Sequence, residues 1–218
     1  METKHLSLTC LYTATVLIVG VEWLIQPLVI ELFRLNSFII ITGIIRLLEL
    51  FVLLGIVKYL KGSLTFISLS IHDLKQSVKR GLAWGIGVGA IITMALTGLW
   101  LINPQWLTSF VSSSFYQSEL QLLTIIVAAV IGPITEEIFF RGIVFHTFRN
   151  QGFILAAGIS AISFAVFHWN NHIPFVQLIG GLLFIVILEK EKSLLSPIIA
   201  HCFGNFVLII VPLFFELP

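Results

Sequence analysis

The segment that decides the fold is LQLLTIIVAAVIGPITEEIFFRGIVFHTF, residues 120–148. It is largely apolar, and it exceeds the roughly 20 residues that a helix needs to cross a bilayer. Three charged residues, Glu136, Glu137 and Arg141, interrupt its second half. Ionisable groups are costly inside a membrane, and by default they mark a functional site. The segment therefore predicts a membrane-spanning helix that carries a site.

The composition of the whole chain agrees with a membrane protein. Of its 218 residues, 58% are hydrophobic and 11% are charged, and the mean hydropathy is +1.06. Soluble domains average about 25% charged residues, so the bilayer is expected to be the solvent for most of the chain. The net charge of +1 does not indicate a basic surface for binding nucleic acid. The two cysteines, Cys10 and Cys202, form neither a disulfide framework nor a CxxC metal motif.

Seven apolar segments predict an all-α, multi-pass transmembrane bundle that forms one integral membrane domain over 1–218. Their ranges are 8–30, 37–60, 82–102, 120–148, 153–169, 174–188 and 194–214. The fifth and sixth segments are short, and the polar residues Asn170, Asn171, His172 and Pro174 separate them. One of these two segments is therefore expected to be re-entrant or buried by its neighbours.

Residues 64–80 are expected to form a further helix that lies in the cytoplasmic interface. Ile67, Ile71, Leu74 and Val78 recur at helical spacing, with basic residues between them. The alternative is a plain basic loop.

The distribution of Lys and Arg predicts the orientation in the cell membrane. Counted over seven spans, nine basic residues fall on one side: Lys4, Lys58, Lys61, Lys75, Lys79, Arg80, Arg149, Lys190 and Lys192. Because basic loops stay in the cytoplasm, the N-terminus is expected to be cytoplasmic and the C-terminus outside.

Four polar side chains from three apolar segments are predicted to meet at one depth. They are Glu136, His168, His201 and Asn205. Counted at about 1.5 Å per helical residue from the cytoplasmic ends, all four lie in the middle zone of a membrane about 30 Å thick. His201 and Asn205 are four residues apart and share one helix face. A carboxylate, two imidazoles and an amide are the parts of a hydrolytic site.

The two adjacent glutamates are expected to have different roles. Glu137 and Arg141 are four residues apart and can form an ion pair, which neutralises two charges in a low-dielectric setting. Neighbouring helical residues point about 100° apart, so Glu136 and Glu137 are not expected to face the same place. Glu136 is then the candidate general base.

Structural alternatives exist for each of these residues. Glu136 could instead pair with Arg141 or with Arg46, and the histidines could be buried groups bonded to the backbone. Zinc could also bind the set, although the chain has no HExxH motif. Elsewhere, Arg46 and Glu49 are three residues apart and are expected to pair, with Glu22 as a further contact.

Three motifs in order resemble the CPBP family of CAAX proteases and bacteriocin-processing proteins, also called the Abi family, which includes type II CAAX prenyl endopeptidases. The motifs are Glu136-Glu137-xxx-Arg141, Phe164-xxx-His168 and His201-xxx-Asn205, each in a separate apolar segment. The run SLLSPIIAH, residues 193–201, is similar to the family's approach to its third motif. The resemblance covers about 120–210, which is expected to be the catalytic core.

The resemblance implies a metal-independent intramembrane glutamic protease that needs no cofactor. In such a protease Glu136 and His168 would activate water, His201 and Asn205 would stabilise the oxyanion, and Glu137 and Arg141 would support the site. The expected partners are membrane lipid and a hydrophobic peptide or membrane-anchored protein as substrate, without nucleic acid. The alternatives are a non-catalytic immunity or scaffold protein, a zinc-dependent membrane protease, and a transporter, for which no repeated half is detectable.

Overall fold

The computed structural model of the protein describes residues 6–33, 37–70, 74–105, 121–169, 174–210 and residue 214. Within these ranges the chain is almost entirely helical and contains no strand. The predicted all-α, multi-pass bundle is confirmed.

Two of the long helices in the described part of the chain contain π-helical stretches. The N-terminal half has α1 (Leu8–Gly20), the π-helical η1 (Val21–Ile25), α2 (Gln26–Phe33), α3 (Phe38–Lys61), the 3₁₀ turn η2 (Leu64–Ile67) and α4 (Leu74–Ile102). The C-terminal half begins with α7 (Gln121–Ile126), π-helical η3 (Val127–Ile131), α8 (Gly132–Glu137) and π-helical η4 (Ile138–Phe145). It continues with α9 (His146–Phe148), the 3₁₀ turn η5 (Arg149–Gln151), α10 (Phe153–Phe167), α11 (Phe175–Glu191) and α12 (Leu195–Ile210).

In the described part of the chain, four helices are long and apolar enough to cross a membrane. They are Leu8–Leu32, Phe38–Lys61, Leu74–Ile102 and Gln121–Gln151. Phe153–Phe167 and Leu195–Ile210 are shorter apolar helices, and α11 has 17 residues and ends among charged side chains. The seven predicted segments therefore correspond to seven helical regions, of which the last three are short. The predicted hinge residues Asn170, Asn171 and His172 lie outside the described residues.

The separate interfacial helix predicted for 64–80 is wrong. The range begins with the 3₁₀ turn η2, and its last residues, from Leu74, are the first turns of α4. The periodic apolar pattern was misleading because Ile67 is fully buried in the main hydrophobic core and not laid on a membrane surface. Residue Ile71 lies outside the described residues.

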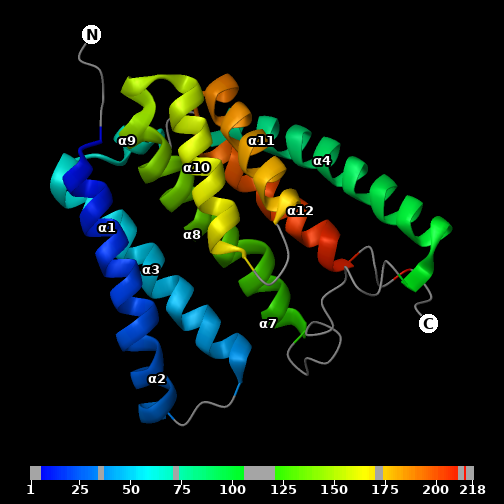
Figure 1. Cartoon of the computed structure of the whole chain (residues 1–218), viewed down its shortest axis with the longest axis horizontal. Coiled ribbons are helices and arrows are strands. Elements are labelled where there is room, and N and C mark those ends of the chain that lie inside the picture. The colour runs from blue at the N-terminus through cyan, green and yellow to red at the C-terminus, as the bar shows by residue number, and fades with distance from the viewer. Residues whose placement is uncertain are drawn as a thin grey trace.

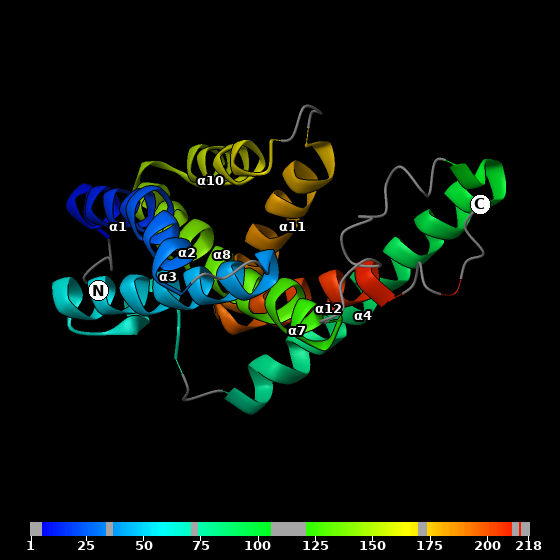
Figure 2. The same cartoon turned by 90° about the horizontal axis from the view of Figure 1, so that it is seen from below.

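The continuous helix from α7 to η4 occupies the centre of the bundle (Figures 1 and 2). The hairpin of α1–α2 and α3 lies on one side of it, and α3 contacts η3, α8 and η4. On the other side α12 contacts η3 and α8, while α10 packs against η4 and against α11. Helices from both halves of the chain therefore surround the segment that carries Glu136, Glu137 and Arg141.

The long helix α4 lies along α12 and extends beyond it (Figures 1 and 2). Glycines allow the two backbones to approach closely, as small residues do in membrane helix pairs. A Cβ atom at Gly81 would lie 2.8 Å from Ile199 Cβ, and one at Gly85 would lie 2.9 Å from Phe203 Cβ. Larger residues at these positions would push α4 away from the helix that carries His201.

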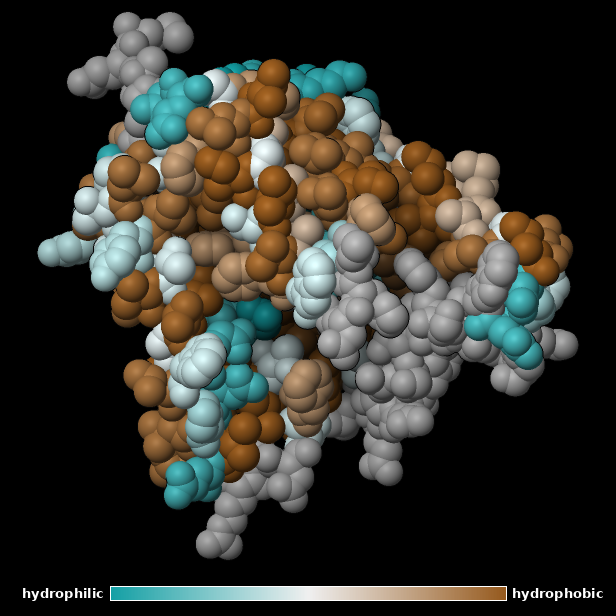
Figure 3. Space-filling model, in the orientation of Figure 1, coloured by the Kyte–Doolittle hydropathy of each residue, from teal (hydrophilic) through white to brown (hydrophobic). Residues whose placement is uncertain are grey.

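Most of the visible surface is apolar, as expected for a protein surrounded by lipid (Figure 3). A hydrophilic patch lies in a hollow of this surface where α3 lies next to α8 (Figure 3). Charged side chains of this region are only partly exposed: 34% for Glu22, 32% for Arg46 and 18% for Glu136. Glu136 of the predicted site is therefore partly open to the surface.

Candidate active site

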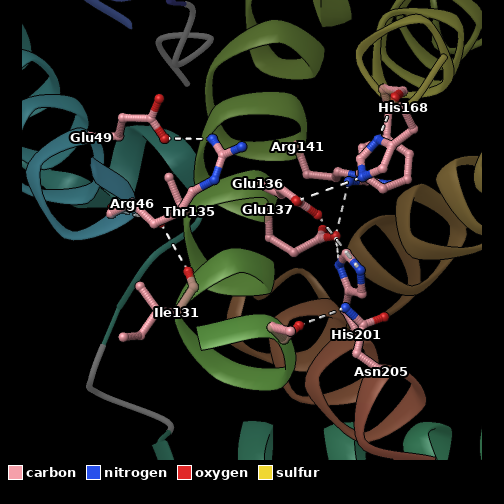
Figure 4. A network of polar contacts seen from close by, with 12 residues as sticks. Arg46, Glu49, Ile131, Thr135, Glu136, Glu137, Arg141, His168, His201 and Asn205 are labelled. Atoms are coloured by element: carbon pink, nitrogen blue, oxygen red, sulfur yellow. Dashed lines mark hydrogen bonds and ion pairs between the residues drawn. The ribbon is translucent and has the colours of Figure 1, made fainter. Parts of the chain in front are cut away.

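Three of the predicted residues converge from three helices (Figure 4). Glu136 lies in α8, His168 directly follows α10, and His201 lies in α12. Glu136 Oε1 is 3.7 Å from His168 Nε2, and Glu136 Oε2 is 3.8 Å from His201 Nε2. Both distances are longer than a direct hydrogen bond. Each carboxylate oxygen of Glu136 thus faces one imidazole nitrogen across a short gap.

The end of α10 fixes the ring of His168. Its Nδ1 lies 2.8 Å from the carbonyl oxygen of Phe164, one turn earlier. Because a carbonyl only accepts hydrogen bonds, Nδ1 carries the proton, and Nε2 of the neutral ring is left as an acceptor. The FxxxH spacing therefore selects the tautomer that presents a lone pair toward Glu136.

His201 lies between the two glutamates. Its Nδ1 donates to Glu137 Oε1 over 2.8 Å, while its Nε2 faces Glu136. The expectation that Glu136 and Glu137 face different places is therefore wrong. Their Cα–Cβ bonds do diverge, but each side chain is long, and the imidazole presents nitrogens on two edges. Both carboxylates reach one ring from opposite sides.

The predicted pair of Glu137 and Arg141 is confirmed. Arg141 Nη1 lies 2.9 Å from Glu137 Oε1, and both side chains are fully buried. This contact is an ion pair without hydrogen-bond geometry, since Nη1 and Nε of Arg141 find no hydrogen-bond acceptor among the described residues. The guanidinium instead lies over two aromatic rings, 4.4 Å from the centroid of Phe164 and 5.3 Å from that of Phe184. The ring faces stabilise the cation in place of missing acceptors.

Asn205 lies one turn after His201 and bonds to the central helix. Its Nδ2 donates to the carbonyl oxygen of Ala128 over 3.0 Å (Figure 4). Ala128 belongs to η3, and π-helical turns often occur at functional sites because they disturb the regular backbone pattern. The amide of Asn205 therefore joins α12 to the central helix beside the His201 ring.

Carbonyls of the second π-helical stretch also accept side-chain hydrogen bonds. In η4, the Phe140 oxygen accepts from Ser160 Oγ at 2.8 Å, and the Arg141 oxygen lies 2.7 Å from His146 Nδ1. These bonds satisfy backbone groups that the apolar surroundings could not. They hold η4 against α10 and fix the backbone from which Arg141 projects.

A second ionic cluster lies beside the site. Arg46 Nη1 is 2.6 Å from Glu49 Oε2 and 3.5 Å from Glu22 Oε1, so both predicted contacts are confirmed. The hydroxyl of Thr135, which precedes Glu136, lies 3.2 Å from the Arg46 carbonyl oxygen. No ion pair joins Arg46 to Glu136 among the described residues, so Arg46 supports the helix next to the site through its backbone.

The arrangement combines a partly exposed carboxylate with two oriented imidazoles. This set can accept a proton from water and place donors beside a developing negative charge. Among the described residues, no group of three His, Cys, Asp or Glu side chains is arranged to hold a metal ion. The zinc alternative therefore depends on an experiment.

Two features of the site had no signal in the sequence. Phe184 of α11 stacks on His201, with ring centroids 4.5 Å apart and 23° between the planes. It is one of many phenylalanines, and its place depends on a long-range contact between α11 and α12. The bond from His201 to Glu137 was also missed, although the EExxxR spacing did identify Glu137 as a paired residue.

Comparison with known proteins agrees with the site. Residues 118–207 match the family model of type II CAAX prenyl endopeptidase Rce1-like proteins. The chain is also 33% identical over 92 residues to the Bacillus subtilis (strain 168) protein named "Putative membrane peptidase YdiL". The resemblance to the CPBP family is therefore confirmed for the segment that contains all three motifs.

The matched regions cover only parts of the two proteins. The alignment spans 42% of this chain and 38% of the Bacillus subtilis protein. No solved structure matches the chain significantly. The first hundred residues, including the Arg46 cluster, lie outside the region that the family model matches.

Proposed function

We propose that the protein is an intramembrane endopeptidase of the glutamic type, which hydrolyses a peptide bond at or within the membrane. The observation that carries the proposal is the convergence of Glu136 on His168 and His201 at 3.7 and 3.8 Å. The family of residues 118–207 and the peptidase name of the relative support it.

In the proposed reaction, water attacks the peptide carbonyl carbon while Glu136 accepts its proton. His168 Nε2, the free acceptor of the neutral ring, holds the second hydrogen of the same water. The carbonyl oxygen becomes an oxyanion in the tetrahedral intermediate. Glu136 then gives its proton to the leaving amide nitrogen as the carbon–nitrogen bond breaks, which produces a carboxyl and an amine terminus.

His201 and Asn205 are proposed to stabilise the oxyanion. Because His201 Nδ1 already donates to Glu137, donation from Nε2 requires the imidazolium form. Glu136, Glu137 and Arg141 together carry one net negative charge, which an imidazolium would balance in a buried setting. The Asn205 amide has two hydrogens and uses one for Ala128, so the other is available.

The proposal is tested by comparing membranes from cells with wild-type protein and with Glu136→Gln. The glutamine has nearly the same shape but cannot accept the proton, so precursor proteins are expected to accumulate while the variant stays folded. Glu31→Gln is the matched control, since Glu31 lies exposed on α2. Full cleavage by the Glu136→Gln protein would exclude the mechanism.

The same assay separates the alternatives. A phenotype that survives simultaneous substitution of Glu136, His168 and His201 would favour a non-catalytic immunity or scaffold protein. Activity that a chelator removes and zinc restores would favour a zinc-dependent protease.

The cytoplasmic placement of the N-terminus, proposed from the Lys and Arg distribution, is tested by labelling single cysteines at the two ends of α4.

A further inference from the structure

A groove lies between α4 and α11, away from the residues of the candidate active site. It has a volume of about 370 Å³ and is lined by residues that include Arg80, Trp84, Gly87, Ile91, Leu183 and Glu191. Small-molecule sites in proteins start at about 300 Å³. The groove is therefore large enough for part of a bound molecule.

One end of the groove is polar and basic. Arg80 Nη1 lies 3.1 Å from Glu191 Oε2, and Trp84 Nε1 donates to Glu191 Oε1 over 2.9 Å. Lys190 Nζ lies 5.2 Å from the centroid of the Trp84 ring. No carboxylate of the described residues is within ion-pair distance of Lys190. Two cations and one anion leave this rim with a net positive charge.

The other end of the groove is apolar and points along α4. Gly87 and Ile91 of α4 and Leu183 of α11 line it, and the Ile91 side chain is exposed. From Arg80 to Ile91 the helix rises about 16 Å, which matches one leaflet of a hydrocarbon core about 30 Å thick. The groove therefore has the length and the polarity of a single lipid molecule.

We propose that this groove binds an anionic phospholipid of the surrounding bilayer. The phosphate lies at Arg80 and Lys190, beside the indole of Trp84, and one acyl chain lies along Gly87, Ile91 and Leu183. Basic pockets between membrane helices are known to bind acidic headgroups on the cytoplasmic side, and tryptophan favours the headgroup level. The site is independent of the proposed proteolysis.

Gly87 provides a direct test, because a Cβ atom there would meet no atom within 4 Å. Gly87→Leu therefore places a side chain at the groove whose Cβ atom meets no protein atom. Gly98→Leu is the matched control: it lies on the same helix, also has no atom within 4 Å of a Cβ, and lies outside the groove. Both changes raise helix propensity by a similar amount. A difference in lipid binding between the two variants is therefore due to the groove.

Native mass spectrometry of the full chain, with phosphatidylglycerol and phosphatidylcholine of equal chain length, measures the binding. The wild type and Gly98→Leu are expected to retain phosphatidylglycerol preferentially, and Gly87→Leu is expected to lose it. Lys190→Gln should lower the preference about fivefold, the contribution of one basic residue near an anionic lipid. Lys75→Gln, with the same change of charge outside the groove, should not.

Four outcomes would overturn the proposal. Equal retention of the two lipids by the wild type would show that the basic rim does not select a headgroup. Equal retention by the two glycine variants would show that the lipid lies elsewhere. A change of oligomeric state in Gly87→Leu alone would assign the groove to a second copy of the chain. If Gly87→Leu does not fold, an equal effect of the two lysine variants decides against the site.

Discussion

Two ionic clusters lie side by side in the bundle and differ in what surrounds them. The inner cluster consists of Glu137, Arg141 and His201, and the outer cluster of Glu22, Arg46 and Glu49. In each, an arginine and a glutamate are one helical turn apart. The glutamate and arginine of the inner cluster are fully buried, with aromatic rings over the guanidinium, whereas Arg46 and Glu22 are about one third exposed.

The surroundings of an ionic cluster separate a candidate catalytic cluster from a structural one. Helical spacing alone describes both clusters equally well. Only the inner cluster continues, through the ring of His201, to a carboxylate that is free of cationic partners other than histidine. Among the described residues, the hydroxyl of Thr135 bonds to the carbonyl oxygen of Arg46, and no ion pair joins the outer cluster to Glu136. The following predictions test this division.

The largest effect is expected from Arg141→Met. Removal of one partner from a buried pair leaves Glu137 as an uncompensated charge, which costs about 3–5 kcal/mol of stability. The melting temperature in detergent is therefore expected to fall steeply, with little folded protein recovered from membranes. The double variant Glu137→Gln/Arg141→Met should recover stability without activity.

Arg46→Met is the matched control for this prediction. Glu49 is buried like Glu137, but Arg46 is 32% exposed, so water can partly replace the lost cation and Arg46→Met should cost less than Arg141→Met. Equal destabilisation by the two arginine variants would contradict the distinction between the clusters.

The second prediction concerns the contact of Glu137 with His201. Glu137→Gln keeps the size of the side chain but removes the carboxylate that accepts from His201 Nδ1 and would balance the charge of the proposed imidazolium. In other hydrolases, the loss of a carboxylate that orients a histidine lowers turnover by about 10⁴-fold. A loss of at least about 10³-fold in cleavage rate per folded molecule is expected. Glu49→Gln, the same change in the outer cluster, should leave the rate unchanged.

Asn205→Ala should have a smaller effect on activity. Loss of one oxyanion donor costs about 10²-fold in rate, while loss of the bond to Ala128 costs about 1 kcal/mol of stability. Both the rate and the melting temperature should therefore fall. A lower melting temperature with an unchanged rate per folded molecule would make Asn205 a structural residue only, and Asn103→Ala at the end of α4 is the control.

The sequence predicted the membrane helices and the convergence of Glu136, His168 and His201, because both follow from apolar length and from depth along each span. It could not predict the π-helical turns, since a segment that is apolar on nearly all faces has no periodicity in which a widened turn would show. The stacking of Phe184 on His201 was also hidden, because it depends on how α11 packs against α12. The error at 64–80 has the same origin: Ile67 has the spacing of an interfacial residue, but tertiary packing buries it.

The smallest effect is expected at a third ionic group, at the charged end of the bundle where α11 ends. Glu189 lies 2.7 Å from Arg149 Nε and 2.8 Å from Lys192 Nζ. The hydrogen bonds from Arg149, followed by those from Lys192, lower the pKa of Glu189 to about 2 from its ordinary value of 4.5. Its carboxylate therefore stabilises the folded state above pH 4.5, and this contribution is lost as the pH falls toward 2.

Thermal unfolding in a non-ionic detergent between pH 2 and 7 measures this contribution of Glu189. Glu189→Gln should lower the melting temperature slightly at neutral pH and should remove part of the acid sensitivity between about pH 4.5 and 2. Arg149→Gln should shift the same loss to higher pH, because the main cause of the lowered pKa is gone. If both variants keep the wild-type dependence of melting temperature on pH, the pair of Glu189 and Arg149 is solvated and contributes nothing to stability. It would then differ from the buried pair of Glu137 and Arg141.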